Sequence, residues 1–184
     1  MKQGNDVLNL YKVLPKYVDA LRDESNGGDK SVYMVGDSKG NRPFIGIITL
    51  CNGMNYFIPL TSYKDRFKYL TAKEPDFTPI YRNGKLVAGI EFSKMIPVPL
   101  NQVRPLDMEL RKHDTGRNRE AKLLRKYEYD WCNSHKDAII EKAQSLYTMF
   151  IKKDPSYKNI KYCLNFPSLE KICKKYEHDH PAQH

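Results

Sequence analysis

Asn52-Gly53 stands between two runs of β-prone residues, Phe44–Leu50 and Tyr56–Leu60. An Asn-Gly pair flanked in this way is the strongest short-range hairpin signal, because both turn positions require a positive φ angle that these residues tolerate. The sequence therefore predicts an antiparallel hairpin here.

A second group of strands is predicted further along the chain. The turn residues Arg82-Asn83-Gly84 precede a β-prone run at Leu86–Phe92, and another run covers Met95–Leu100. Two prolines interrupt this last run, and because proline cannot donate to a strand ladder, they confine it to a sheet edge or a strand end. One further strand is expected at Ser31–Val35, inside a glycine-rich loop.

The pattern changes after Arg104-Pro105, where glycine nearly vanishes. Apolar residues from Asn118 to Ile151 recur at helical spacing. Ser134-His135-Lys136-Asp137 is typical of an N-cap followed by an acidic first turn, so two helices are expected rather than one. Asp154-Pro155 ends the second helix, and a last short helix is expected from Ser168 to Tyr176.

Apolar residues three or four apart also predict a short amphipathic helix at Leu10–Leu21, despite Pro15. Strands followed by helices are typical of an α+β protein, and 184 residues suit about one domain. We predict a single domain over residues 1–184, with a compact antiparallel sheet, packed helices and a mainly helical C-terminal half.

The chain has a net charge of +9, which favours phosphate-rich or acidic partners. The densest basic run, Arg111–Lys126, holds seven basic residues against only Asp114 and Glu120. It is a candidate phosphate-binding strip, although a solvated helix face is an equally good interpretation. The 13 tyrosines add rings that could stack on unpaired bases, or that could lie in the core.

Neither a membrane span nor a secretion signal is expected. The longest apolar stretch, Phe44–Leu50, is far shorter than the roughly 20 residues that a span needs, and charges scattered through the first twenty residues leave no signal-peptide core. These features predict a cytosolic protein. The four cysteines lack a C-x-x-C pair, so reduced thiols are expected rather than bridges or zinc. The clustered His178, His180 and His184 are read as a polar tail rather than a metal site.

Common enzyme motifs such as the P-loop and H-E-x-x-H are missing from the sequence. Hydroxyls and cations instead gather where the second hairpin strand ends. These residues are Thr61, Ser62, Lys64, Arg66 and Lys68. Lys39 and Arg42 lie just before the first strand, and a hairpin brings that strand's entry near its partner's exit. Arg42 and Ser62 are therefore expected to be neighbours.

Such a cluster suits the cleavage of RNA by its own 2′-hydroxyl, a reaction that needs neither metal nor nucleotide. The reaction requires a group that accepts or orients the hydroxyl proton, positive charge on the pentacovalent phosphorane, and a donor for the leaving oxygen. The alternative is that Thr-Ser-x-Lys after a strand forms only a turn with an ordinary N-cap.

Three segments together resemble the ToxN/AbiQ family of type III toxin–antitoxin endoribonucleases, and their spacing is closest to the CptN-like branch. They are Arg42–Ile47, Tyr56–Lys64 with its Pro-Leu-Thr-Ser-x-Lys block, and Met95–Val98. Asn133–Lys136 and Asn165–Glu170 agree, so the resemblance extends over roughly residues 15–176.

This resemblance implies a partly open barrel like that of MazF/Kid-like toxins, with helices packed on it. It also implies a metal-independent endoribonuclease that requires no cofactor and cuts cellular or phage RNA. The implied inhibitor is a repeated RNA pseudoknot rather than a protein. Such a toxin cuts the precursor of its antitoxin and stays bound to the product in a closed protein–RNA assembly.

The resemblance also implies roles for single residues. Ser62 takes the place of the family's active-site serine, Lys64 that of the lysine two positions on, and Thr61 that of the preceding hydroxyl. Arg42 stands where the family often has lysine, and Tyr33 is the tyrosine available for the family's upstream tyrosine.

Further cations are expected to bind RNA. They are Lys39, Arg66, Lys68, Arg111, Lys112, Arg117, Arg119 and Lys122. Two other functions stay open at this point. One is a non-catalytic basic module that binds RNA or DNA through the strip, with a steep salt dependence. The other is an adaptor whose basic surface meets an acidic protein.

Overall fold

The predicted hairpin forms in the computed structural model, which describes residues 7–34 and 45–181. Strand β2 (Ile45–Cys51) pairs antiparallel with β3 (Met54–Ser62). The turn residues Asn52 and Gly53 have φ angles of 51° and 73°. Both angles lie in the left-handed region that a tight hairpin turn requires, which explains why Asn and Gly occupy these positions.

Five further strands extend this hairpin into one antiparallel sheet. They are β1 (Leu10–Val13), β4 (Phe77–Arg82), β5 (Lys85–Glu91), β6 (Ile96–Pro97) and β7 (Val103–Pro105). The order across the sheet is β4-β5-β3-β2-β1-β7, and β6 pairs with β3 beside this path. Among the described residues β4 and β7 do not pair, so the sheet is open rather than closed into a barrel.

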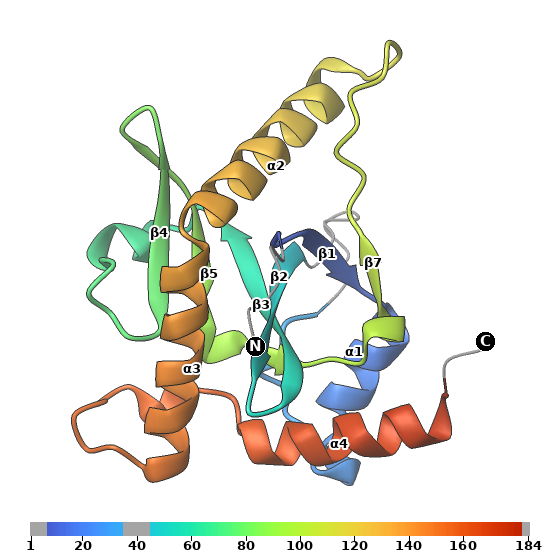
Figure 1. The fold of residues 1–184 in the computed structure, drawn as a ribbon, viewed down its shortest axis with the longest axis vertical. Coiled ribbons are helices and arrows are strands. Elements are labelled where there is room, and N and C mark those ends of the chain that lie inside the picture. The colour runs from blue at the N-terminus through green and yellow to red at the C-terminus, as the bar shows by residue number, and fades with distance from the viewer. Residues whose placement is uncertain (1–6, 35–44, 182–184) are drawn as a thin grey trace.

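Helices cover the sheet and make up most of the C-terminal half. They are α1 (Pro15–Arg22), α2 (Gly116–Ser134), α3 (Lys136–Lys152) and α4 (Phe166–Asp179). Figure 1 shows α3 running alongside β4 and β5, α4 lying across one end of the sheet next to α1, and α2 extending away at the opposite end. This arrangement confirms the predicted α+β class. Within the described part of the chain, no helix is both long and apolar enough to cross a membrane.

A buried polar network ties the hairpin to the helices. The hydroxyls of Tyr56 and Tyr147 both donate to Oε1 of Glu170, at 2.7 and 2.9 Å, and the Asn52 side chain donates to the Tyr147 hydroxyl at 2.7 Å. Tyr56 is fully buried and Glu170 is 9% exposed. Because a buried polar group without a partner is costly, these hydrogen bonds hold α3 and α4 against the turn end of the hairpin.

The helix expected at Leu10–Leu21 is a strand followed by a helix. Leu10 and Val13 are buried on β1, which pairs with β2 on one side and β7 on the other. The helix begins only at Pro15, where proline's missing N–H costs nothing. Strand pairing with a segment about ninety residues away, invisible to local periodicity, overrides the helical spacing.

One expected strand is also wrong, and one observed strand was not predicted. Residues 31–34 form a turn and irregular backbone instead of a strand, with the Val32 N–H bonded to the Asp29 carbonyl at 3.1 Å; Val35 lies outside the described residues. Strand β4 was not expected at all, because Pro79 breaks its pattern. Among the described residues this strand lies at the edge of the sheet and pairs only with β5, which explains why the proline is tolerated.

The boundaries of the other elements agree more closely with the sequence. The run at Met95–Leu100 is reduced to the two residues of β6, as its prolines indicate. The second long helix begins after His135, not after Ser134, whose hydroxyl donates to the Trp131 carbonyl within α2. The last helix, α4, is longer than predicted at both ends, and Asn165 caps it by accepting the Ser168 N–H. All four cysteines are free thiols, and Cys51, Cys132 and Cys173 are buried.

Gly46 on β2 provides a test of this packing. A Cβ there would lie 2.1 Å from the backbone oxygen of Ile58 and 2.7 Å from the Phe57 ring. We predict that Gly46→Ala lowers the free energy of unfolding by about 1–3 kcal/mol or more, because the backbone must move. Gly116→Ala, with nothing within 4 Å, is the control and should change it by less than about 0.5 kcal/mol. Urea denaturation measures both, and equal stability of the two variants would contradict the packing described.

Candidate active site

The end of β3 carries the two predicted hydroxyls. Thr61 and Ser62 pair with Gly89 and Ala88 of β5, and the Tyr63 N–H donates to the Val87 carbonyl at 2.9 Å. Thr61 is half-buried and Ser62 is exposed. The sheet therefore fixes the backbone of both residues while leaving the Ser62 side chain open to solvent.

A short 3₁₀ helix, η2 (Asp65–Tyr69), follows and is anchored by Phe67. Phe67 is fully buried, with its ring centre 4.8 Å from that of Phe77 on β4, and its N–H donates to the Lys64 carbonyl at 2.8 Å. The Lys64 ammonium lies 5.9 Å and the Arg66 guanidinium 5.3 Å from the centre of the Phe67 ring. The same buried ring therefore contacts both cations and helps to hold them side by side.

Glu91, the last residue of β5, joins these cations. Its side chain is only 7% exposed, its Oε2 pairs with the Arg66 guanidinium, and its Oε1 lies 3.6 Å from the Lys64 ammonium. Within the described part of the chain Oε1 accepts no hydrogen bond, so Lys64 is its main compensation. The side chains of Lys64 and Arg66 remain 42% and 55% exposed, which leaves them accessible to an anion.

Tyr33 completes the cluster from the N-terminal segment. Its hydroxyl donates to Oε2 of Glu91 at 2.9 Å and accepts from the Arg66 guanidinium at 3.2 Å. The Lys64 ammonium lies 4.9 Å from the centre of its ring. The predicted tyrosine is therefore beside the predicted lysine, although more than thirty residues separate them in the sequence.

The surroundings change the pKa values of these groups. Burial lowers the pKa of Lys64, with Arg66 adding to the effect and Glu91 opposing it. Burial alone would lower the pKa of Arg66 too, but the charge of Glu91 and the contact with Tyr33 outweigh it and raise that pKa. Burial and the neighbouring Glu91 raise the pKa of Tyr33 well above its ordinary value. At neutral pH the cluster thus holds two cations and a neutral phenol.

Glu91 was not expected from the sequence. The sequence does contain a sign of it, since Glu91 is a single acidic residue inside the apolar run Leu86–Phe92. A carboxylate is rarely buried without a cationic partner, so such a residue indicates a nearby cation. Arg42 and Lys39 lie outside the described residues, so the expected proximity of Arg42 and Ser62 stays a prediction. Lys68 is exposed on η2 and lies 3.8 Å from Asp65.

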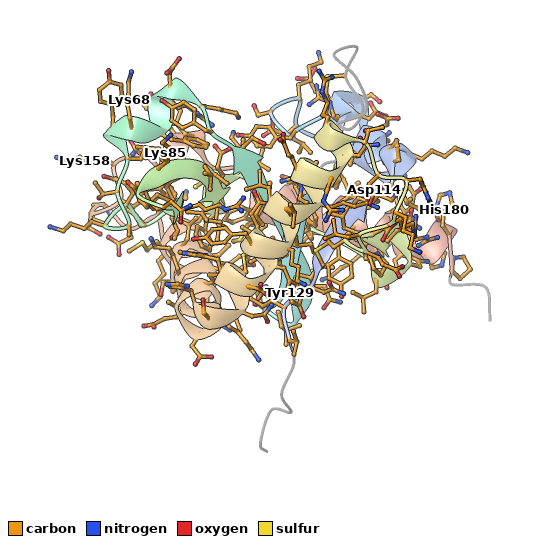
Figure 2. The ribbon with its side chains drawn as sticks, turned by 90° about the horizontal axis from the view of Figure 1, so that it is seen from above. Lys68, Lys85, Asp114, Tyr129, Lys158 and His180 are labelled. Carbon is orange, nitrogen blue, oxygen red and sulfur yellow. The ribbon has the colours of Figure 1, made fainter. Side chains whose placement is uncertain are left out.

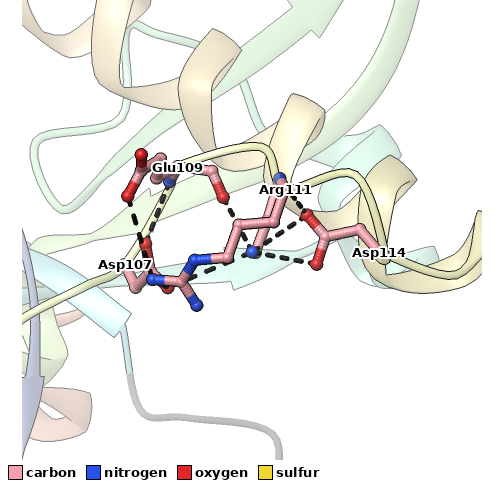
Figure 3. A network of polar contacts seen from close by, with 5 residues as sticks. Asp107, Glu109, Arg111 and Asp114 are labelled. Carbon is pink, nitrogen blue, oxygen red and sulfur yellow. Dashed lines mark hydrogen bonds and ion pairs between the residues drawn. The ribbon is translucent and has the colours of Figure 1, made fainter.

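The basic strip divides into two parts. Figure 3 shows Arg111 among Asp107, Glu109 and Asp114 of the loop before α2. Arg111 pairs with Asp107 at 2.9 Å, and Lys122 pairs with Asp114 at 3.0 Å and donates to the Glu109 carbonyl. Only 17% of the Lys122 side chain is exposed. These two cations stabilise the loop, and their acidic partners neutralise much of the charge that would attract a ligand.

A third cation of the strip, Arg125, pairs with the buried Glu128 at 2.7 Å. Three others are open to a ligand. Lys112, Arg117 and Arg119 are exposed and form no ion pair within the described part of the chain. Figure 2 shows Lys68 of η2 and Asp114 of the loop at opposite sides of the molecule. The strip and the cluster around Glu91 are therefore separate basic regions.

Comparison with known proteins supplies the family. A family model described as the toxin ToxN of type III toxin–antitoxin systems matches residues 9–174. The chain belongs to this family. The endoribonuclease ToxN of Bacillus thuringiensis subsp. kurstaki is 25% identical over 179 residues, which cover 95% of this chain and 87% of that protein. The endoribonuclease AbiQ of Lactococcus lactis subsp. lactis is 25% identical over 134 residues, or 69% of each chain.

A solved structure confirms the fold of this ToxN family member. It belongs to work on type III systems in which a non-coding RNA pseudoknot selectively inhibits the toxin. The TM-score is 0.74 at 24% identity, and the match covers 94% of this chain and 99% of the other. The recognised family is thus correct, while the CptN-like branch stays a prediction.

Neutralising Glu91 tests how the cluster is held. We predict that Glu91→Gln lowers the free energy of unfolding by about 1–3 kcal/mol, because two adjacent cations and a tyrosine lose their shared anion. Glu141→Gln, an exposed change on α3, should stay within about 0.5 kcal/mol of the parent. Urea denaturation at neutral pH compares the two. If the two variants were equally stable, Glu91 would not be holding the cluster together.

Proposed function

We propose that this toxin is an endoribonuclease that cuts single-stranded RNA at the cluster around Glu91, without a metal, by attack of the RNA's own 2′-hydroxyl. One observation carries the proposal. Two accessible cations, Lys64 and Arg66, are held by a buried carboxylate immediately after the exposed Ser62. The family and the two endoribonucleases to which the chain is similar agree with this chemistry.

The residues divide the work of the reaction. The 2′-oxygen loses its proton and bonds to phosphorus, while the bond from phosphorus to the 5′-oxygen breaks. The 5′-oxygen takes up a proton and leaves as a hydroxyl, and a 2′,3′-cyclic phosphate remains. Lys64 and Arg66 hold the phosphate and stabilise the charge that grows on its oxygens. Ser62 and Thr61 orient the 2′-hydroxyl or the phosphate, and Arg42 adds a further cation. Tyr33 stays protonated and positions Glu91 and Arg66 through its hydroxyl.

The inhibitor that we propose is a repeated pseudoknot RNA, processed by the toxin and retained in a closed protein–RNA assembly. An RNA pseudoknot inhibits the toxin of the similar solved structure. The exposed Lys112, Arg117 and Arg119 offer a basic face for such an RNA, apart from the cluster that cuts. Together with Lys39 and Lys68 they would bind the RNA backbone in the cytoplasm, and the whole chain would act as one domain.

A second candidate function is a non-catalytic RNA-binding module. The observation in its favour is that the loop beside these exposed cations, marked by Asp114, lies on the opposite side of the molecule from Lys68 of η2, so the cations would bind RNA without any cleavage. Such a module would show steep salt dependence but leave its RNA intact.

Cleavage with EDTA present separates the two functions. We predict that the parent cuts a tandem-repeat precursor RNA and leaves 2′,3′-cyclic phosphate ends. Ser62→Ala and Lys64→Ala should each slow cleavage by roughly 10²- to 10³-fold, because each removes a group that acts on the reacting phosphate. Both variants should also relieve growth arrest on expression.

Lys174→Ala is the control for the loss of one exposed lysine, because Lys174 lies on α4 and pairs with no acidic residue in the described part of the chain. It should cut at the parental rate. Binding of the RNA by the parent without new ends would instead favour the second function.

The pH dependence of cleavage tests Lys64 itself. Because burial lowers the pKa of Lys64, its cation is lost at a lower pH than that of an ordinary lysine, and the rate should fall on that alkaline limb. Lys64→Arg keeps its charge at high pH, so the limb should move upward even if the maximal rate drops. Rates are corrected for cleavage without protein, and Lys136→Arg is the control. Identical limbs for the parent and Lys64→Arg would show that another group titrates.

A further inference from the structure

A cavity of about 380 Å³ opens beside the cluster and shares two of its residues. Arg66 and Glu91 line it together with residues from the start of β4 and from the 3₁₀ helix η5 (Ile160–Tyr162). This volume falls at the lower end of the range for pockets that hold small molecules, about 300–1,000 Å³. The cavity is therefore of a size for one flat ring rather than for a helix or a strand.

The lining combines apolar and aromatic surface with a few polar groups. Phe77 is buried and forms an apolar wall, while Tyr162 also lines the cavity and is 59% exposed. Asp76 and Asn159 add polar atoms at the same cavity. Ring surface for stacking together with a few hydrogen-bonding groups is the combination that proteins use to hold an unpaired base.

The walls of the cavity are held in place by contacts that span the chain. The Asp76 carboxylate accepts the Tyr157 hydroxyl at 2.8 Å, and the Asp76 carbonyl accepts the Phe92 N–H at 2.9 Å. The Lys94 ammonium donates to the Tyr162 carbonyl at 3.2 Å. Figure 2 shows Lys68 and Lys158, from the segments on either side of the cavity, on the same side of the molecule. Because these hydrogen bonds hold its walls together, the cavity is already formed without a ligand.

We propose that this cavity binds the nucleobase next to the scissile phosphate, with the base stacked on Tyr162. The inference rests on the proposed function and assigns a subsite to it. A phosphate bound to Arg66 would lie at the edge of the cavity. The base of the adjoining nucleotide would therefore be close enough to enter the cavity directly. The Lys161 ammonium, 5.1 Å from the centre of the Tyr162 ring, supplies positive charge for the next phosphate.

The experiment measures binding, so that it does not depend on cleavage. The protein is the Ser62→Ala variant, and the probes are copies of a short single-stranded RNA in which each nucleotide in turn is abasic. We expect one abasic position to weaken binding by roughly 5- to 150-fold, the range for loss of one base stacked on an aromatic ring. With Tyr162→Ala added, the intact RNA should bind as weakly as that abasic copy, and the abasic position should have no further effect.

Two controls separate stacking from other causes. Adding Tyr162→Phe keeps the ring and should keep the abasic effect. Adding Tyr69→Ala removes another exposed tyrosine, 77% accessible and outside the cavity lining, and should also keep it. The inference is overturned if each abasic RNA shows the same loss of affinity on the Ser62→Ala protein as on the protein that also carries Tyr162→Ala. The proposed function is tested by a different measurement: it is contradicted if the parent protein does not cleave the intact RNA.

Discussion

Glu91 brings a negative charge into the end of a buried strand, and the local structure is arranged around that charge. An ion taken out of water without compensation costs several kcal/mol. Here the compensation comes from Lys64 and Arg66 on one segment and from Tyr33 on another. Because the two cations face a fixed anion, they are held in position before a substrate arrives. Catalysis by electrostatic stabilisation depends on such preorganisation, since groups already in place need not reorganise during the reaction.

Strand β3 connects this site to the rest of the molecule. Its first half pairs with β2 and β6, its last residues pair with β5, and its end carries Thr61 and Ser62. Tyr56, near its start, bonds to Glu170 of α4, which also accepts from Tyr147 of α3. The C-terminal helices thus support the strand that positions the hydroxyls. The half of the chain without the cluster's residues therefore supports the cluster through β3.

What the sequence could predict depended on how local the cause was. The hairpin was predictable because Asn52-Gly53 sets its turn within two residues. Strand β1 was not, because its partner β7 lies about ninety residues away, and β4 was hidden by Pro79, which only an edge position allows. In the site, Ser62 and Lys64 come from one continuous motif, and the family resemblance supplied Tyr33. Glu91 needed the folded sheet, since nothing local shows which cations neutralise it.

Acidic neighbours explain why the basic strip offers less free charge than its count of basic residues indicates. The count of charges between Arg111 and Lys126 leaves out Asp107 and Glu109, which precede the strip and, with Asp114, bind Arg111 and Lys122. The exposed charge is reduced to Lys112 of the loop and to Arg117 and Arg119 at the start of α2. Figure 2 shows Asp114 of this loop on the far side of the molecule from Lys68 of η2. On the proposed function, a flexible single strand would occupy the cluster and its adjoining cavity without touching the start of α2. On the proposed function, a folded RNA that reached both regions at once would bind far more tightly than a substrate, without any change in the groups proposed to cut.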